Sequence, residues 1–380
     1  MGGVCDIIIP VWNQPGWTRR CLEALVTGTD FPYRLILIDN GSEVETRTLL
    51  TDFCDRLGAQ ALLIRNGENV GFVKAVNQGL ARSSGKYIVI LNNDTLAYPG
   101  WLSEMIAVAE SEPDIGLVNP ASNNFKISPE EARHWNGPPY SGLAKAVGFC
   151  LLMKREILEE VGFLDEDYGV GFYEDTDLSR RVQRAGYRCV MSRRAYVHHE
   201  IGRTFNVRRD TGELMARART IFCQKWGSPV KVMAFLRHDH LHGEDHFPVC
   251  LELFNALADR GVETKIFLEG LHRDAARSLV RDMGRVDHFG VRLRGTNPPL
   301  HGLCFGFYAA TRVFLNSPRS RKGYQLMVTD DRRIQWLSRG VGRFRRLPSV
   351  LLPAPIRDVK GEMGRLLAVI EATQGWRSGG

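Results

Sequence analysis

The first part of the chain alternates short apolar runs with stretches in which apolar residues recur every three or four positions. The runs predict buried strands, and the three-to-four spacing predicts amphipathic helices that pack on them. The expected strands are residues 4–11, 34–38, 59–64 and 87–91, and the expected helices are residues 16–26, 43–57 and the later part of 69–85. This rhythm of strand and helix predicts an α/β fold built on a parallel sheet.

The run from Tyr87 to Leu91 is apolar throughout, which is typical of a strand buried on both faces. It ends at Asn92, Asn93 and Asp94, whose side chains compete for backbone hydrogen bonds and favour a turn. In open α/β sheets, ligands bind beyond the carboxyl ends of the strands. A carboxylate there suits a divalent cation that takes further ligands from phosphate. The alternative is a turn-forming Asp94 that caps the following helix.

Two other expected strands also end in polar residues. Asn13 follows the first strand and Asp39 follows the strand at 34–38. Because the carboxyl ends of parallel strands lie at the same edge of a sheet, Asn13, Asp39 and Asp94 are expected along one edge. This shared edge predicts a binding site.

After residue 94 the same rhythm continues around one long irregular segment. The expected elements are helices at 98–112, 155–161 and 212–226 and strands at 114–118, 144–153, 187–191 and 195–197. Asn, Pro and Gly accumulate over residues 119–141, which predicts a loop that covers a site. The densest group of carboxylates precedes a helix expected at about 176–185, where the helix dipole favours an anion near Asp175.

A change of rhythm at Gly227, Ser228 and Pro229 predicts a boundary between domains at residues 1–227 and 228–380. The second part has strand patterns at 231–237 and 263–268, from Val313 and from Tyr324, and helix patterns at 248–260 and 273–283. These patterns predict a second, smaller Rossmann-like α/β domain without a glycine-rich dinucleotide fingerprint. A length of 380 residues agrees with two domains.

The net charge of +7 permits attraction to phosphate-rich partners. Much of the excess positive charge lies in the segment from Arg332 to Arg346. This segment either contacts a membrane surface or forms a solvated helix face, and the sequence leaves both alternatives open. The aromatic residues do not alternate with the arginines as in nucleic-acid-binding modules, so no nucleic-acid partner is expected. The eight dispersed cysteines predict buried thiols in a reducing cytosol, and no signal peptide or membrane span is expected.

Seven stretches of the chain match one family in order and spacing over roughly residues 4–226. They are IIIPVWNQ, LILIDNGS, NVGFVKAVNQGL, YIVILNNDT, VGFCLLMKREILEEVGFLDE, FYEDTDLSRR and AYVHHEIGRTF. Together they resemble the inverting family-2 glycosyltransferases, which have a GT-A fold, a Rossmann-like domain with a mixed sheet. The LNNDT form resembles rhamnosyltransferases that use dTDP-rhamnose, although UDP-sugars are a close alternative.

The resemblance implies a pocket for a nucleotide-sugar donor at the end of the first strand. Pro10, Trp12 and Asn13 would line it, with Trp12 stacking on the base, and core packing is the alternative for Trp12. Asp39 resembles the family's contact to uracil or thymine, because a carboxylate accepts a hydrogen bond from a pyrimidine N–H. A plain turn-forming role is the alternative for Asp39.

Further donor contacts are implied by the NVGFVKAVNQGL stretch and by the strand end. Gly71 would allow the backbone to approach the ligand, and Asn77 matches a residue that lines the pocket. Lys74 would reach phosphate, with an exposed helical lysine as the equal alternative. Asn93 would touch the ribose.

The resemblance also implies a metal site. Asn92, Asn93 and Asp94 stand where the family usually has a DxD pattern, so Asp94 is carried over as the ligand. His199 would complete the site or meet the diphosphate, because neighbouring strand residues point to opposite sides and only one of His198 and His199 can face it. Mg²⁺ or Mn²⁺ is implied, bound mainly together with the donor diphosphate.

Asp175 aligns with the family's catalytic base, and Glu174 would bind the acceptor or orient the base. In a single displacement one carboxylate takes the proton of the acceptor hydroxyl, which agrees with inversion. A helix N-cap is the alternative role for Asp175.

The sequence therefore predicts a metal-dependent inverting glycosyltransferase that moves a sugar from dTDP-rhamnose or a UDP-sugar to a saccharide or lipid-linked acceptor. Assembly of polysaccharide or cell-envelope glycan in the cytoplasm, or at the membrane periphery, is the implied setting. In the second domain, the stretch FPVCLELFNALADRGVETKIFLEG resembles the first half of GT-B glycosyltransferases. Either the chain is a fragment of a longer, two-enzyme protein, or this domain serves acceptor binding or assembly. The alternative is a catalytically inactive scaffold that binds nucleotide-sugar. The presence of Asp94, Asp175 and His199 disfavours this alternative.

Overall fold

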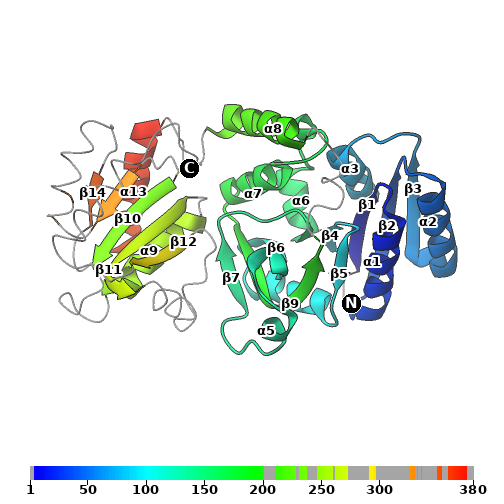
Figure 1. The fold of residues 1–380 in the computed structure, drawn as a ribbon, viewed down its shortest axis with the longest axis horizontal. Helices are drawn as coiled ribbons and strands as arrows, with labels where there is room; N and C mark the ends of the chain where they lie inside the picture. Colours follow the sequence, from blue (N-terminus) through cyan, green and yellow to red (C-terminus); the bar gives the residue numbers. More distant parts are fainter. Residues whose placement is uncertain are drawn as a thin grey trace. The chain divides into compact units, whose positions relative to one another are not determined.

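The computed structural model describes residues 4–200, 211–227, 231–237, 246–259, 262–272, 291–296, 326–329, 332, 335, 349–352 and 358–374. The chain forms two compact units (Figure 1). The first comprises Met1–Ser141 with Lys145–Lys225, and the second comprises Gly142–Ala144 with Trp226–Gly380. The functional division into domains 1–227 and 228–380 stays a prediction.

The first unit is built on a nine-stranded sheet. Its strands are β1 (Cys5–Val11), β2 (Tyr33–Asn40), β3 (Ala61–Asn66), β4 (Tyr87–Leu91), β5 (Thr95–Ala97), β6 (Ile115–Ala121), β7 (Tyr140–Leu143), β8 (Cys150–Lys154) and β9 (Arg188–His199). The order is β3-β2-β1-β4-β8-β6-β9-β5, and β7 pairs with β9. Strands β1 to β4 pair in parallel, whereas β8 is antiparallel to both β4 and β6. The mixed α/β sheet domain is confirmed, and the simpler expectation of a parallel sheet holds for β1 to β4.

Helices cover this sheet. They are α1 (Pro15–Gly28), α2 (Val44–Leu57), α3 (Phe72–Arg82), α4 (Trp101–Ser111), α5 (Pro129–Arg133), α6 (Arg155–Val161), α7 (Glu174–Arg184) and α8 (Thr211–Trp226). Short 3₁₀ turns lie at η1 (Gly58–Gln60), η2 (Asn123–Phe125) and η3 (Glu166–Tyr168). Figure 1 shows α2 beside β3 at the end of the sheet.

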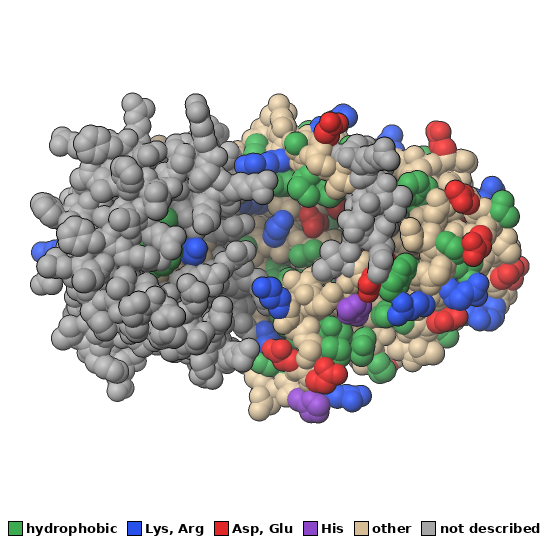
Figure 2. All heavy atoms as spheres, in the orientation of Figure 1, with side chains coloured by type: hydrophobic (Ala, Val, Ile, Leu, Met, Phe, Trp, Pro, Cys, Tyr) green, Lys and Arg blue, Asp and Glu red, His purple; other side chains and the backbone are tan. Residues whose placement is uncertain are grey.

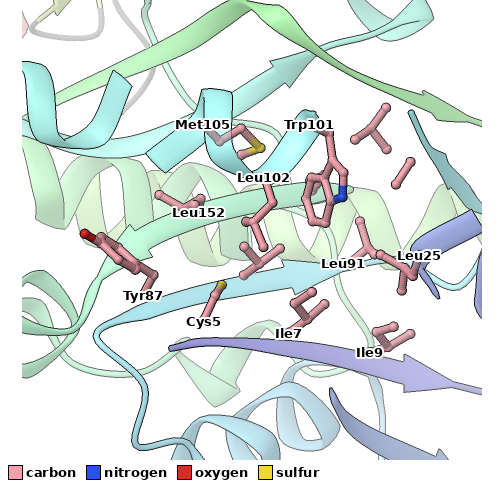
Figure 3. Packing of buried hydrophobic residues seen from close by; sticks show 14 of the residues in the cluster. Cys5, Ile7, Ile9, Leu25, Tyr87, Leu91, Trp101, Leu102, Met105 and Leu152 are labelled. Atoms are coloured by element: carbon pink, nitrogen blue, oxygen red, sulfur yellow. The ribbon is translucent and has the colours of Figure 1, made fainter. Parts of the chain in front are cut away.

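The hydrophobic core explains why β1 and β4 are apolar at every position. Figure 3 shows Ile7 and Ile9 of β1 packed on one face of the sheet near Trp101 of α4. Ile8 points to the opposite face, where α3 lies so close that a Cβ on Gly79 would come within 2.4 Å of the Ile8 side chain. Burial of each such side chain stabilises the fold by about 1.5–3 kcal/mol. Both faces are therefore covered, as the continuous apolar runs predict.

Several element boundaries differ from the predictions, and the loop expected at 119–141 contains η2, α5 and the start of β7. Helix α7 begins at Glu174 and has Glu174, Asp175 and Asp177 in its first turn, where the helix dipole favours acidic side chains. The strands expected at 187–191 and 195–197 are one strand, β9. Strand β8 begins only at Cys150, because the N–H groups of Val147 and Gly148 bond to the side chains of Asn119 and Asp175 and not to the backbone of a neighbouring strand.

The second unit contains a five-stranded sheet in which every pair is parallel. Its elements are β10 (Lys231–Arg237), α9 (His246–Asp259), β11 (Glu263–His272), β12 (Val291–Thr296), β13 (Leu326–Thr329), β14 (Ser349–Leu351) and α13 (Val359–Gln374). The strand order is β12-β11-β10-β13-β14. Ala234, Leu253, Ile266 and Leu366 are buried in its core.

Some predictions fall outside the described residues. These are the helix at 273–283, the strand from Val313 and, apart from Arg332 and Gln335, the basic segment 332–346. The relation of the second unit to a GT-B enzyme stays a prediction. None of the described helices combines the length and the apolar character needed to cross a bilayer. Figure 2 shows acidic and basic side chains interspersed over the described face of the first unit.

Candidate active site

A cavity of about 450 Å³ lies in the first unit. Its walls come from the end of β1, the turn after β4, the segment before β8, the start of α7 and the end of β9. Eight of the residues predicted for the site line it: Pro10, Trp12, Gly71, Asn93, Asp94, Glu174, Asp175 and His199. The volume falls within the range of small-molecule sites.

Asp94 and His199 meet at one wall of the cavity. Nε2 of His199 lies 3.3 Å from Oδ1 of Asp94, and the two side chains are only 12% and 7% exposed. The sheet register brings them together, because Thr95 of β5 pairs with His199 of β9 and the N–H of Glu200 donates to the Asp94 carbonyl at 3.0 Å. The neighbouring His198 instead lies 3.3 Å from Glu200 and is not part of the cavity wall.

The donor atoms at this wall fit a hard divalent cation. They are a carboxylate oxygen and an imidazole nitrogen, both close to the cavity. Oδ1 of Asn92, which also lines the cavity, is buried and has no hydrogen-bond partner. The side chain of Asn93 already has a partner within the fold, because its Nδ2 donates to Oγ1 of Thr18 at 2.9 Å. Two protein ligands are too few for a closed site, so further ligands must come from a bound anion or water.

The acidic pair at the start of α7 forms another part of the wall. The N–H of Gly148 donates to Oδ2 of Asp175 at 3.1 Å, and Oγ1 of Thr176 donates to Oδ1 at 3.0 Å. Nζ of Lys145 donates to the same hydroxyl at 3.1 Å, which completes a chain from lysine to carboxylate. Asp175 is therefore held as a hydrogen-bond acceptor at the cavity.

Glu174 differs from its neighbour because it is buried and its Oε2 has no hydrogen-bond partner. Burial, together with the negative charge of Asp175, raises the pKa of Glu174 to about 8. Near neutral pH Glu174 therefore keeps its proton. The pair thus combines a hydrogen-bond donor, Glu174, with an acceptor, Asp175.

The backbone conformation at position 71 requires glycine. Its φ is +92°, and a Cβ there would come within 3.0 Å of the carbonyl oxygen of Gly169. The loop before it is fixed by Asn40, whose Nδ2 donates to Oδ1 of Asn69 and whose Oδ1 accepts from the N–H of Val70. Asn40 and Asn69 also line the cavity and were not predicted, although Asn40 directly follows a predicted site residue in the LILIDNGS stretch.

Four residues that were predicted to contact the nucleotide-sugar donor do not line the cavity. Oδ1 of Asn13 accepts from the N–H of Glu43 at 2.8 Å. Asp39 is 1% exposed, and its two oxygens accept from the N–H of Ser42 and from Arg65, both at 2.9 Å. The carboxylate of Asp39 is thus used inside the fold, and its geometry does not support the predicted base contact.

The other two residues lie on α3. Asn77 bonds to both the N–H and the carbonyl of Leu164, at 3.1 and 2.9 Å, and to Oε1 of Glu166 at 3.2 Å. Its amide thus joins α3 to Leu164 and to η3, and Asn77 does not line the cavity, so its donor contact stays a prediction. Lys74 is exposed on the same helix and also lies outside the cavity wall.

Residues 6–162 match the family model described as Glycosyl transferase family 2. This match supports a family-2 glycosyltransferase domain in the first unit. The matched segment contains Asp94 and ends before Glu174, Asp175 and His199.

Similar proteins match about half of this chain. An uncharacterized protein of Sinorhizobium fredii is 30% identical over 56% of this chain and 26% of its own length. The O-antigen biosynthesis protein RfbC of Myxococcus xanthus is 24% identical over 51% of this chain and 17% of its own length. The chain thus spans about a quarter or less of these two relatives. A solved mannosyltransferase from Pyrobaculum calidifontis, in complex with GDP-Man and Mn²⁺, has a TM-score of 0.45 at 18% identity, over 59% of this chain and 65% of that chain.

Proposed function

We propose that this chain is a metal-dependent glycosyltransferase that takes a sugar from a nucleoside-diphosphate donor and inverts its anomeric carbon. One observation carries the proposal: a single cavity is lined by the Asp94–His199 pair and by the Glu174–Asp175 pair. The first pair suits a cation that binds a diphosphate, and the second suits removal of a proton from an acceptor hydroxyl. The family-2 match supports the same class of reaction.

Donor binding falls to the residues at the carboxyl end of β1 and β4. Trp12 and Pro10 would contact the base, Asn93 the ribose, and the backbone at Gly71 would allow close approach of the ligand. Asp94 and His199 would hold Mg²⁺ or Mn²⁺ with the diphosphate. When bound, the cation neutralises negative charge on the diphosphate leaving group.

The chemical step needs one base. Asp175 accepts the proton of the acceptor hydroxyl, the acceptor oxygen forms a bond to the anomeric carbon, and the bond from that carbon to the diphosphate oxygen breaks. The N–H of Gly148 and the hydroxyl of Thr176 hold the carboxylate in position. Protonated Glu174 donates a hydrogen bond to the acceptor or to Asp175. A single displacement inverts the configuration at the anomeric carbon.

We further propose dTDP-rhamnose or a UDP-sugar as donor and a saccharide or lipid-linked acceptor. The rhamnosyltransferase-like LNNDT stretch supports the first donor, and the name of the O-antigen relative supports glycan assembly as the setting. In this proposal residues 1–227 carry catalysis in the cytoplasm. Residues 228–380 serve acceptor binding or assembly, with Arg332 to Arg346 as the membrane-facing segment.

A thermal-shift panel tests this proposal. UDP-, dTDP- and GDP-sugars are each added with Mn²⁺, with Mg²⁺ and with a chelator, since a ligand that binds the native state raises the melting temperature. We expect a shift with one class of nucleotide that disappears with the chelator. No metal-dependent shift with any donor would contradict the proposal. Binding without release of nucleoside diphosphate in the presence of cell-envelope acceptors would favour the inactive scaffold.

A further inference from the structure

Three residues outside the predicted site contact the backbone and side chain of His199. The backbone N–H of His199 donates to Oδ1 of Asn123 at 2.9 Å, and Nδ2 of Asn123 donates to the His199 carbonyl at 2.8 Å. The imidazole ring stacks on Phe149 with a centroid distance of 5.1 Å and an angle of 12°. The hydrogen bonds of the two ring nitrogens remain to be assigned, because they depend on the tautomer.

Those nitrogens face different groups. Nε2 lies 3.3 Å from Oδ1 of Asp94. Nδ1 lies 3.1 Å from Nδ2 of Asn124 and 3.3 Å from Oδ1 of the same amide. A carboxylate oxygen only accepts, an amide nitrogen only donates and an amide oxygen only accepts. The partner of Nδ1 therefore decides which tautomer of a neutral His199 is stable.

We propose that Asn124 is the positioning residue that allows His199 to exchange its hydrogen bond to Asp94 for a divalent cation. Without cation, Nε2 carries the proton and donates to Asp94, while the Asn124 amide N–H donates to Nδ1. With cation, Nε2 must offer its lone pair, so Nδ1 carries the proton and Oδ1 of Asn124 accepts it. One amide supports both states because both its atoms lie within reach of Nδ1.

Neighbouring contacts hold the backbone at Asn124. Its backbone N–H donates to Oγ of Ser122 at 3.3 Å, and the Ser122 hydroxyl donates to Oδ1 of Asn123 at 2.9 Å. Asn123 and Asn124 form most of η2, between β6 and α5. The inference rests on the proposed cation site at Asp94 and His199. It adds a residue that touches neither the cation nor the sugar but controls the affinity for the cation.

The test compares two substitutions in the full chain. Asn124→Leu removes both hydrogen-bonding atoms at similar size, and Asn124→Asp keeps an acceptor but no donor. Free Mn²⁺ is followed by electron paramagnetic resonance, with the UDP, dTDP or GDP that gives the largest metal-dependent thermal shift. We expect Asn124→Leu to weaken Mn²⁺ binding about 10–100-fold. We expect Asn124→Asp to bind Mn²⁺ close to wild type, because its carboxylate accepts from Nδ1–H. Asn136→Leu, an exposed position in the same segment, is the matched control.

A second measurement does not depend on the leucine variant folding. Nitrogen-15 spectra of histidine-labelled protein, with the His199 signals assigned by their loss in His199→Gln, report which ring nitrogen carries the proton. Without metal we expect a proton on Nε2 and none on Nδ1 in wild type, and a proton on Nδ1 in Asn124→Asp, where carboxylates face both ring nitrogens. Equal Mn²⁺ affinity in folded Asn124→Leu, or no proton on Nδ1 in Asn124→Asp, would overturn the inference and leave the cation site standing. Absence of Mn²⁺ binding by wild type would overturn the cation site as well.

Discussion

Nε2 of His199 lies 3.3 Å from Oδ1 of Asp94, although one residue ends the long strand β9 and the other lies in the turn between β4 and β5. The antiparallel pairing of β5 with β9 fixes this contact, because Thr95 stands opposite His199. A carboxylate and an imidazole are thus held together by the sheet itself. In the proposed cation site, this rigid placement would hold the two ligands without ordering a loop.

Replacing Asp175 with Asn removes the proposed base but keeps the size of the side chain and one of its two accepting oxygens. The carbonyl of Asn accepts from the N–H of Gly148, so the start of α7 stays folded. We expect kcat to fall about 10²–10⁴-fold, as for loss of general base catalysis. Affinity for the donor, measured by calorimetry, should stay unchanged. Asp167→Asn, an exposed position in the same acidic stretch, is the control, and full transfer activity in Asp175→Asn would contradict the assignment.

Glu174 makes stability depend on pH in a defined direction. Its pKa in the folded protein is raised to about 8, so its contribution is fully present below the unfolded value of about 4.3 and is lost as pH rises through the folded pKa. Gln resembles the protonated acid and does not titrate. Glu174→Gln should therefore gain stability relative to wild type between pH 6 and pH 9, on the order of 1–3 kcal/mol in urea denaturation.

Two variants control this measurement. Glu159→Gln, at an exposed position, should show no such difference between the two pH values. Asp175→Asn removes a charge that raises the Glu174 pKa, so it should reduce the pH dependence. An equal stability difference between wild type and Glu174→Gln at pH 6 and pH 9 would show that Glu174 is not a buried neutral acid.

Asn77 should matter for stability and not for donor binding. Its amide bonds to Leu164 and Glu166, and truncation leaves the buried N–H and carbonyl of Leu164 without this partner. We expect Asn77→Ala to lower the free energy of unfolding by about 1–3 kcal/mol. Donor affinity at a temperature where the variant is folded should equal that of wild type and of Lys74→Ala. A large loss of donor affinity would restore the donor contact predicted for Asn77.

The sequence predicted the sheet elements more closely than the details of the site. The apolar run from Tyr87 to Leu91 corresponds to β4, because burial on both faces leaves no polar position in the strand. Trp12 directly follows β1 and Asp94 comes three residues after β4, so strand prediction also placed them at the sheet edge. Their roles stay predictions.

Contacts made by irregular segments could not be predicted in this way. Asn123 and Asn124 lie in a stretch without periodicity, and only the folded chain shows that they surround His199. The apolar stretch 144–153 favoured a strand throughout. In its first half, however, the N–H groups of Val147 and Gly148 bond to the side chains of Asn119 and Asp175. Asn77 matched a motif, but the motif carried no information on which side of α3 faces the cavity.

The most direct test of the account measures donor binding to wild type and Asp94→Asn by calorimetry, each with Mn²⁺ and with a chelator. The donor is the nucleotide-sugar selected by the thermal-shift panel. We expect Mn²⁺ to tighten binding to wild type roughly 10-fold or more, about 1.4 kcal/mol, and to have little effect on Asp94→Asn. Asp52→Asn, an exposed control, should behave as wild type. Equal enhancement by Mn²⁺ in Asp94→Asn would contradict a cation site at Asp94 and His199.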